Sequence, residues 1–429
     1  MKINFLIAGM FYFLSFQCLA DIQEMDLALA IRTAELNSPQ LKSELAQLHA
    51  GEEKMRVEKA NYLPSIDAAA IAANGSPGAF GLLGIDNNIS SADRIGAGVG
   101  VVIKQIISDF GRTKASVDIA KDEVKLQENL KLLVASDIGI KILQTYLECA
   151  TLKSQIEDAA FTRDQAKVIA SETNKFVKSG QRSIVERYLV DSQAMEAETL
   201  GAELTERVDL FERRLAVQTG QKQIEKVGCL DLRTPSNEFS IAKIESQVRT
   251  SVLFDVNAIR LNIAKLHLLR SEADSRPTFF ALANAGYFDR RLDSGLWNYS
   301  AGLAISIPIF DGYRVDAESQ RNRYEVEAVQ RRTEAIEEMI RDYNLKLESA
   351  ISSSRIRYEF LKREIALGQK AFDLAKNRYF AFKGSMVDLR DALKNINRIK
   401  LAIDESKKSL LLSRGEKAIF NGAIQSYSH

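Results

Sequence analysis

Side chains that commonly carry catalysis are few and scattered in this chain of 429 residues. The three histidines, His49, His267 and His429, are far apart in sequence and have none of the short spacings typical of metal ligands. No catalytic constellation accompanies them. We therefore expect no enzymatic activity, no cofactor and no bound metal.

Two cysteines, Cys149 and Cys229, remain beyond the N-terminal leader described below. Cys149 lies near the middle of a long predicted helix, and Cys229 lies in a segment of mixed character. A disulfide in an oxidising compartment is one possibility. We expect instead that both are free, buried thiols, which is a common state for cysteine in a helical core.

A pair of carboxylates could act on ions without catalysis. Asp388 and Asp391 are three residues apart, so a helix places them on one face. If three copies of the chain assembled with threefold symmetry, the pairs would form stacked acidic rings that bind cations and favour their passage. The alternative is an ordinary solvated, charged face.

Charge and the N-terminus narrow the class of protein. The 58 basic and 57 acidic residues nearly cancel, so no nucleic-acid partner is indicated. Residues 1–20 have the pattern of a secretory signal, with Lys2, an apolar run and small residues before a cut between Ala20 and Asp21. A lipoprotein signal at Cys18 is the alternative, and Ser15-Phe16-Gln17 disfavours it.

Two stretches have the period of two that is typical of β-strands. In the segment 295–312, apolar and small or polar residues alternate, and the apolar set begins with Trp297 and Tyr299. A shorter run at 95–104 alternates in the same way. Aromatic residues at one end of a long alternating strand are typical of strands that cross an outer membrane. Each run is followed by a glycine, at Gly111 and Gly312, and then by a long helical segment.

The helical segments are unusually long. No proline occurs between Pro77 and Pro235, and Gly139 is the one intrinsic helix breaker between Arg112 and Ser179. A helix over that span would be about 100 Å long. Coiled-coil spacing recurs within it at Leu133, Ile140, Leu143, Leu147 and Ala150. This stripe alone is equally typical of an ordinary core or dimer interface.

The two halves of the chain repeat one pattern. Equivalent breakers are offset by 277 − 64 = 213, 312 − 111 = 201, 377 − 174 = 203 and 422 − 220 = 202 residues. The first repeat, 21–220, comprises a helix, a strand pair (65–107), a long helix (112–178) and a return helix (183–219). Residues 221–245 form a connecting equatorial subdomain. The second repeat, 246–429, comprises a helix, a strand pair (278–309), a long helix (313–380) and a return helix (386–421).

Four strands per chain are too few to close a transmembrane barrel, and an open sheet edge in lipid leaves backbone groups unpaired. Three chains would supply 12 strands, enough for a water-filled lumen. The predicted fold is therefore mainly α-helical with a small membrane β part. It is a trimeric 12-stranded outer-membrane barrel continued by a coiled-coil periplasmic tunnel.

The chain resembles the TolC family of outer-membrane channels over about residues 25–422. The segments that carry the resemblance are Asn37–Leu41, Ala60–Pro64, Ser108–Arg112, Phe176 with Gly180, and Pro308–Gly312. The resemblance implies a homotrimer in outer-membrane lipid that works with a periplasmic membrane-fusion adaptor. The turn at 109–112 and the tip at 180–183 are most similar to the subgroup that serves ABC exporters in type I protein secretion. The transported substrate is left open.

Two other classes of protein share some of these features. The nearest alternative is the outer-membrane component of a proton-driven drug or metal pump of the resistance-nodulation type. A more remote one is a trimeric coiled-coil surface or structural protein. That class should have one terminal set of strands, whereas this chain has two internal pairs at a fixed offset.

The resemblance places the turns 177–186 and 381–391 at the periplasmic tip. Candidate gate residues there are Asp388, Asp391, Glu186, Arg187 and Arg390. Candidate adaptor contacts are Val177, Gly180 and Gly384, since glycine allows a partner helix to approach closely. The alternative for each glycine is a plain turn residue.

Overall fold

The computed structural model describes residues 23–74, 95–221, 226–245, 252–289 and 296–422. The signal sequence expected at 1–20 lies outside these ranges. The chain divides into two compact units, one of 1–37, 141–243 and 351–412, the other of 38–140, 244–350 and 413–429. Four helices continue from one unit into the other: α3 (Arg112–Lys178), α5 (Pro235–Glu245), α7 (Arg314–Phe380) and α8 (Met386–Phe420). No helix among the described residues is long and apolar enough to span a membrane.

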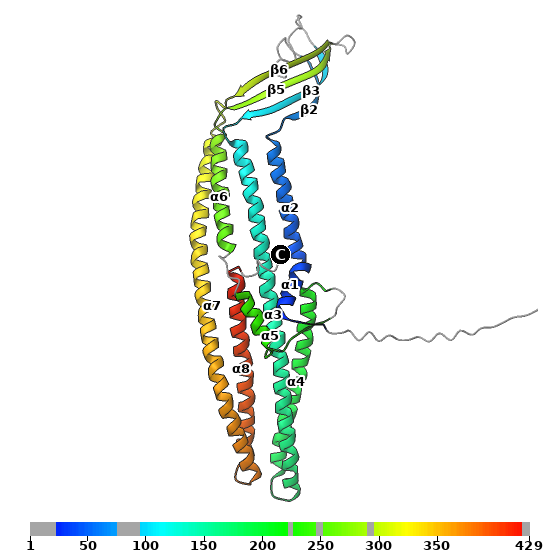
Figure 1. Cartoon of the computed structure of the whole chain (residues 1–429), viewed down its shortest axis with the longest axis vertical. Helices are drawn as coiled ribbons and strands as arrows, with labels where there is room; N and C mark the ends of the chain where they lie inside the picture. Colours follow the sequence, from blue (N-terminus) through cyan, green and yellow to red (C-terminus); the bar gives the residue numbers. More distant parts are fainter. Residues whose placement is uncertain (1–22, 75–94, 222–225, 246–251, 290–295, 423–429) are drawn as a thin grey trace, which may run out of the picture. The chain divides into compact units, whose positions relative to one another are not determined.

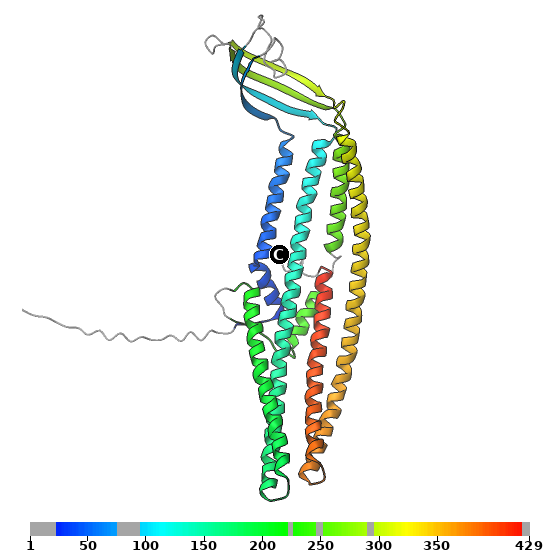
Figure 2. The ribbon, with the colours of Figure 1, turned by 180° about the vertical axis from the view of Figure 1, so that it is seen from behind.

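A four-stranded antiparallel sheet dominates one end of the second unit. It contains β2 (Ser65–Asn74), β3 (Ile95–Ser108), β5 (Thr278–Asp289) and β6 (Leu296–Ser306), in the order β2-β3-β5-β6. Figures 1 and 2 show the four strands side by side in that order. Within the described residues, β2 and β6 are therefore the two edges of this sheet.

The strand register separates an apolar face from a small or polar one. Val99 pairs with Tyr287, which pairs with Trp297, so these side chains share a face. The exposed apolar residues of this face are Ile66, Val99, Val101, Ile103, Phe279, Trp297, Tyr299, Leu303 and Ile305. On the other face, the Asn284 amide donates a hydrogen bond to the Ser300 hydroxyl at 2.8 Å. The alternation expected for the strand in 295–312 is thus present in β6.

Two glycines allow the central strands to approach closely. Gly100 pairs with Gly286, and a Cβ on Gly100 would lie 2.9 Å from the Cα of Gly286. The reverse substitution would meet Gly100 Cα at the same distance. A side chain at either position would therefore force β3 and β5 apart.

The remaining elements of this unit are α2 (Pro39–Ala60), α6 (Val252–Ala273), the first parts of α3 and α7, and the end of α8. Asp109 begins α3, because its carboxylate accepts hydrogen bonds from the Thr113 amide and hydroxyl and from the Gly111 amide. Arg112 then pairs with Asp274, 2.9 Å away, just beyond α6. The motif 109–112 thus fixes the start of the long helix.

In the first unit, two helical hairpins pack together. The first contains α3 and α4 (Ile184–Gln218), and the second contains α7 and α8 (Figure 1). Their shared core near the turns contains Ile169, Val190, Phe372, Leu389, Leu393 and Ile396. The unit also includes β1 (Gln23–Met25), paired in parallel with β4 (Val227–Cys229), and the helices α1 (Leu27–Asn37) and α5 (Pro235–Glu245).

The expectation of two free thiols is wrong: Cys149 and Cys229 form a disulfide. Their Cα atoms are 6.2 Å apart, and both residues are fully buried. Tyr146 explains the proximity, because its hydroxyl donates to Met25 O at 2.9 Å and accepts from Leu230 N at 3.1 Å. It thereby holds the small β1–β4 sheet against α3, one helical turn from Cys149.

The two halves of the chain match in element length. Helices α2 and α6 each have 22 residues, α3 and α7 each have 67, and α4 and α8 each have 35. The first helix differs from expectation. Ser38 caps a new helix with Pro39 in its first turn, so the single helix predicted before the first strand pair is divided into α1 and α2.

Candidate functional site

The turns that join the helices of each hairpin lie at the same end of the first unit (Figures 1 and 2). In the first turn, Gly180 has a φ of +71°, and the Gln181 amide donates to Phe176 O. This is the usual left-handed end of a helix. Ser183 then caps α4 by accepting from the Val185 amide.

The second turn has the same backbone design with a different residue at its critical position. Phe382 takes the left-handed conformation, with φ +60°, and the Lys383 amide donates to Arg378 O. Phe382 is thus the counterpart of Gly180, at an offset of 382 − 180 = 202. Gly384 has another role, since a Cβ there would lie 3.1 Å from the Tyr379 amide nitrogen.

Arg182 connects the two turns. Its guanidinium donates to Tyr379 O at 2.9 Å and to Gly384 O at 3.2 Å, both in the other hairpin. It also lies over the rings of Tyr379, at 4.4 Å, and Phe382, at 5.2 Å. Its side chain is only 14% exposed, so these contacts are partly shielded from water.

Tyr379 and Glu186 complete the connection. The buried Tyr379 hydroxyl donates to Glu186 Oε2 at 2.8 Å and lies 3.3 Å from the Thr173 hydroxyl. Arg182 Nη1 is 3.7 Å from Glu186 Oε1. Burial is the main cause that raises the pKa of Tyr379 to about 12, so its hydroxyl remains a donor at physiological pH. We refer to Arg182, Glu186 and Tyr379 as the tip clamp.

Aromatic packing supports the tip clamp. The ring of Phe176 meets that of Phe382 edge to face, with centroids 4.9 Å apart, and lies 6.2 Å from Phe380. The first hairpin therefore contributes one ring and one cation to a cluster otherwise formed by the second. Such contacts contribute about 0.5–2 kcal/mol each, so the clamp is strong for a surface feature and weak beside a core.

The other predicted gate residues lie near the tip without bridging the hairpins in the contacts found. Arg187 bonds Asn174 and Asp191, all within the first hairpin. Arg390 pairs with its neighbour Asp391 at 3.2 Å. Asp388 and Asp391 are exposed on α8. The structure therefore brings Glu186 into the clamp and leaves the acidic pair facing away from the hairpin core.

The predicted adaptor-contact residues lie on both turns. Gly180 is exposed, while Val177 and Gly384 are half-buried. Two principal clamp residues, Arg182 and Tyr379, were not among the predicted site residues. Arg182 stands in a turn predicted to be exposed, and its ring partners are 197 and 200 residues away in sequence (379 − 182 and 382 − 182). The signal available was an arginine in one turn and aromatic residues at the equivalent turn of the repeat.

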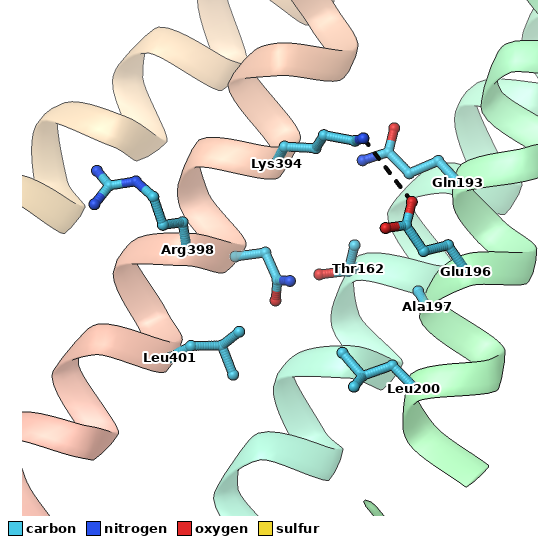
Figure 3. A pocket seen from close by; sticks show the side chains of 9 residues that line it. Thr162, Gln193, Glu196, Ala197, Leu200, Lys394, Arg398 and Leu401 are labelled. Carbon is cyan, nitrogen blue, oxygen red and sulfur yellow. Dashed lines mark ion pairs between the residues drawn. The ribbon is translucent and has the colours of Figure 1, made fainter. Parts of the chain in front are cut away.

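On the side of the shared core that is farther from the turns, a cavity of about 330 Å³ separates α8 from α3 and α4 (Figure 3). Its polar lining includes Lys394 and Glu196, whose charged groups are 3.9 Å apart. The buried Asn397 Oδ1 has no hydrogen-bond partner. The other lining residues are Thr162, Gln193, Ala197, Leu200, Arg398 and Leu401. The hairpins are therefore packed less completely here than at the tip.

Residues 30–221, which lie largely within the first repeat, match the family model described as outer membrane efflux protein. Over this part, the chain is similar to the outer membrane efflux protein family. Members of that family are channels of the outer membrane rather than enzymes, and solved structures of outer-membrane proteins share the fold of this chain. Such channels belong to tripartite export systems. No curated protein matches this sequence.

Solved structures extend the likeness to the second repeat, which the family model does not cover. VceC from Vibrio cholerae is 17% identical with a TM-score of 0.74, covering 92% of this chain and 96% of VceC. The CmeC outer membrane channel of Campylobacter jejuni is 14% identical with a TM-score of 0.73, covering 98% and 94%. The open state of the MtrE outer membrane channel of Neisseria gonorrhoeae is 15% identical with a TM-score of 0.70, covering 92% and 89%. These structures share the fold, which confirms the predicted mainly helical channel architecture.

Proposed function

We propose that three copies of this chain assemble into an export channel whose 12 strands form one barrel. The sheet of each chain has two edge strands, β2 and β6, and an unpaired edge in lipid costs several kcal/mol per backbone group. Pairing β6 of one copy with β2 of the next would satisfy both edges. The exposed apolar face that includes Trp297 and Tyr299 would then meet lipid.

Exposed apolar stripes on the helices support the same assembly. On α7, Phe360, Leu367 and Leu374 recur every seven residues, and each is about two-thirds exposed. On α4, Tyr188 and Met195 show the same period. Stripes at this spacing are typical of coiled-coil contacts between chains. The trimer would bury them.

The proposed inner-membrane partner is an ABC exporter, reached through a periplasmic membrane-fusion adaptor, as in type I protein secretion. The sequence of the tip, Gly180–Ser183, supports this partner, as does the prediction of a secretory signal cut after Ala20 rather than a lipoprotein signal at Cys18. The motif 109–112 supports it less. Its side chains cap α3 and bind Asp274, and this structural role would be the same with either partner. The alternative partner is a proton-driven drug or metal pump.

Exchange of components in cells would distinguish the partners. The chain would be expressed in a Gram-negative host that lacks its own exit channel. One strain would carry an ABC exporter with its adaptor and a secreted protein, and the other a proton-driven pump with its adaptor. The proposal predicts secretion in the first strain and no drug resistance in the second. Resistance without secretion would favour the pump, and failure of both would contradict an exit channel.

The tip clamp is the proposed closure of this channel, and Val177, Gly180 and Gly384 are the proposed adaptor contacts. An adaptor that binds better to separated hairpins would open the tip by shifting this equilibrium. We also propose that Asp388 and Asp391, exposed beside the clamp, line the pore as acidic rings.

The acidic rings have a direct test in planar bilayers. Replacing both residues, as Asp388→Ala with Asp391→Ala, should weaken block by divalent cations and reduce cation selectivity. The matched control is Asp164→Ala, which removes an exposed α3 carboxylate paired with Arg163. Unchanged divalent block in the double variant would contradict the rings.

A further inference from the structure

A short strap ties the two hairpins together away from the tip. It consists of residues 229–234, beginning with the last residue of β4. One end is attached to α3 through the Cys149–Cys229 disulfide. The other end carries Arg233, whose guanidinium reaches both α3 and α8. The strap is therefore linked to α3 covalently and to α8 through the charged group of Arg233.

Arg233 joins two buried carboxylates. Its Nη2 lies 2.6 Å from Asp158 Oδ2 on α3 and 2.9 Å from Asp404 Oδ2 on α8. The side chains of Asp158 and Asp404 are 2% and 1% exposed, whereas that of Arg233 is 41% exposed. One arginine thus covers two acids from the surface, and both acids bond the same nitrogen.

The surrounding charges leave this cluster rich in negative charge. Lys400 of α8 lies 3.2 Å from Asp158, and the strap's own Asp231 accepts from Ser154 and from the Arg233 amide. Glu157 of α3 reaches Arg233 at 3.4 Å from a solvent-exposed position. Tyr358 of α7 interacts with Asp404 and also with Glu238 of α5 and its neighbour Glu359, and Glu238 is paired with Lys407 of α8.

We propose that Asp158, Arg233 and Asp404 form a proton-operated clasp that holds α8 against α3 more tightly in acid than at neutral pH. When Asp404 takes up a proton, the total negative charge of Asp158, Asp231 and Asp404 falls by one, while Arg233 and Lys400 remain positively charged. The clasp then keeps its hydrogen bonds without a second buried charge. Its consequence for transport, a tunnel that resists opening in an acidic periplasm, rests on the proposed function.

The direction follows from the proton affinity of Asp404. Burial, its main cause, raises the pKa of Asp404 to about 6, Arg233 lowers it, and Asp158 and Asp231 raise it. If α8 leaves α3, Asp404 enters water and its pKa returns to its ordinary value of 3.8. The closed clasp therefore binds the proton more tightly than the open one. Acidification from pH 7 to pH 5 should favour closure by about tenfold.

Local amide hydrogen exchange measures this equilibrium in the full-length protein in detergent. Exchange would be followed in peptides covering 227–234 and 400–408 between pH 5 and pH 8, after correction for the intrinsic pH dependence of exchange. Wild type should be protected about tenfold more at pH 5 than at pH 7. Asp404→Asn, which is neutral at every pH, should be highly protected without this step. The control Asp164→Asn should retain the wild-type step.

A second variant keeps the test informative if Asp404→Asn does not fold. Arg233→Gln removes the charge that lowers the pKa of Asp404, so the step should move to higher pH. A flat wild-type profile, or a step that persists in Asp404→Asn, would overturn the clasp. Because the readout is local protection, its failure would leave the exit-channel proposal untouched, and failure of the secretion test would not alter this result.

Discussion

At the tip, Arg182 reaches from one hairpin into the turn of the other and donates to two backbone carbonyls there. Arg187, five residues later, makes its bonds within its own hairpin. The pair therefore contrasts an arginine that joins the two hairpins with one that bonds only within its own hairpin. This contrast provides a matched test.

We expect Arg182→Ala to open the tip, because hydrogen bonds from a charged group contribute about 1.5–3 kcal/mol and the cation–π contacts are lost as well. The measurement is entry of a large hydrophilic antibiotic into cells that express the variant. Sensitivity should rise about tenfold or more, while Arg187→Ala should behave as wild type. Equal sensitivity of the two variants would contradict the clamp.

The raised pKa of Tyr379 predicts that the stability of the folded protein depends on pH. Its pKa in the folded protein, about 12, exceeds the ordinary value of 10.0, so the folded state binds the phenolic proton more tightly. The stabilisation from this hydroxyl is complete below pH 10 and is lost as pH rises from 10 to 12. Tyr379→Phe should cost about 1 kcal/mol at pH 7, and the difference from wild type should shrink above pH 10. Thermal midpoints across this range give the comparison, and a gap that widens with alkaline pH would be inconsistent with this role.

Single residues of the site were only partly accessible to prediction. Glu186 and the turns could be placed because helix breakers and caps act locally in sequence. The contact between Arg182 and Tyr379 could not be predicted from sequence. These residues are 197 positions apart, and their contact depends on how the two hairpins pack together. Gly384 was given as an adaptor contact or a plain turn residue, whereas Phe382 takes the left-handed position and Gly384 makes room for the Tyr379 backbone.

At the scale of elements, periodicity carried the most information. A period of two located the alternation of β3 and β6, and the absence of proline located α3 within residues 112–178. The strands β1 and β4 have only three residues each and show no such pattern. Their pairing joins segments about 200 residues apart, so local sequence could not predict it. The disulfide was missed for the same reason: that pairing brings Cys229 to α3.

The disulfide should contribute substantially to stability, because it closes a loop of about 80 residues in the unfolded chain. We expect Cys149→Ser with Cys229→Ser to lower the free energy of unfolding by about 2–4 kcal/mol. Denaturant titration under oxidising conditions measures the loss. The intact mass of the unreduced wild type should be lower than that of its reduced form by two hydrogen atoms. Identical masses and unchanged stability would show that the bond does not form.

At the scale of the whole molecule, the repeated sequence builds a sheet that one chain leaves with two edges. The same chain exposes apolar stripes at heptad spacing on α4 and α7. Both features are unfavourable in an isolated copy, and threefold assembly would resolve both. Sequence could predict the need for oligomerisation because four strands are too few to close a barrel. It could not predict how the two hairpins of one chain are fastened at the tip and at Arg233.

The most direct test of the account is the protein mass of the mature chain in detergent, measured by light scattering with the detergent contribution subtracted. Three chains per particle, and insolubility once detergent is removed, are the predicted result. A single chain per particle that remains soluble without detergent would contradict it, since neither the barrel nor the tunnel could then form.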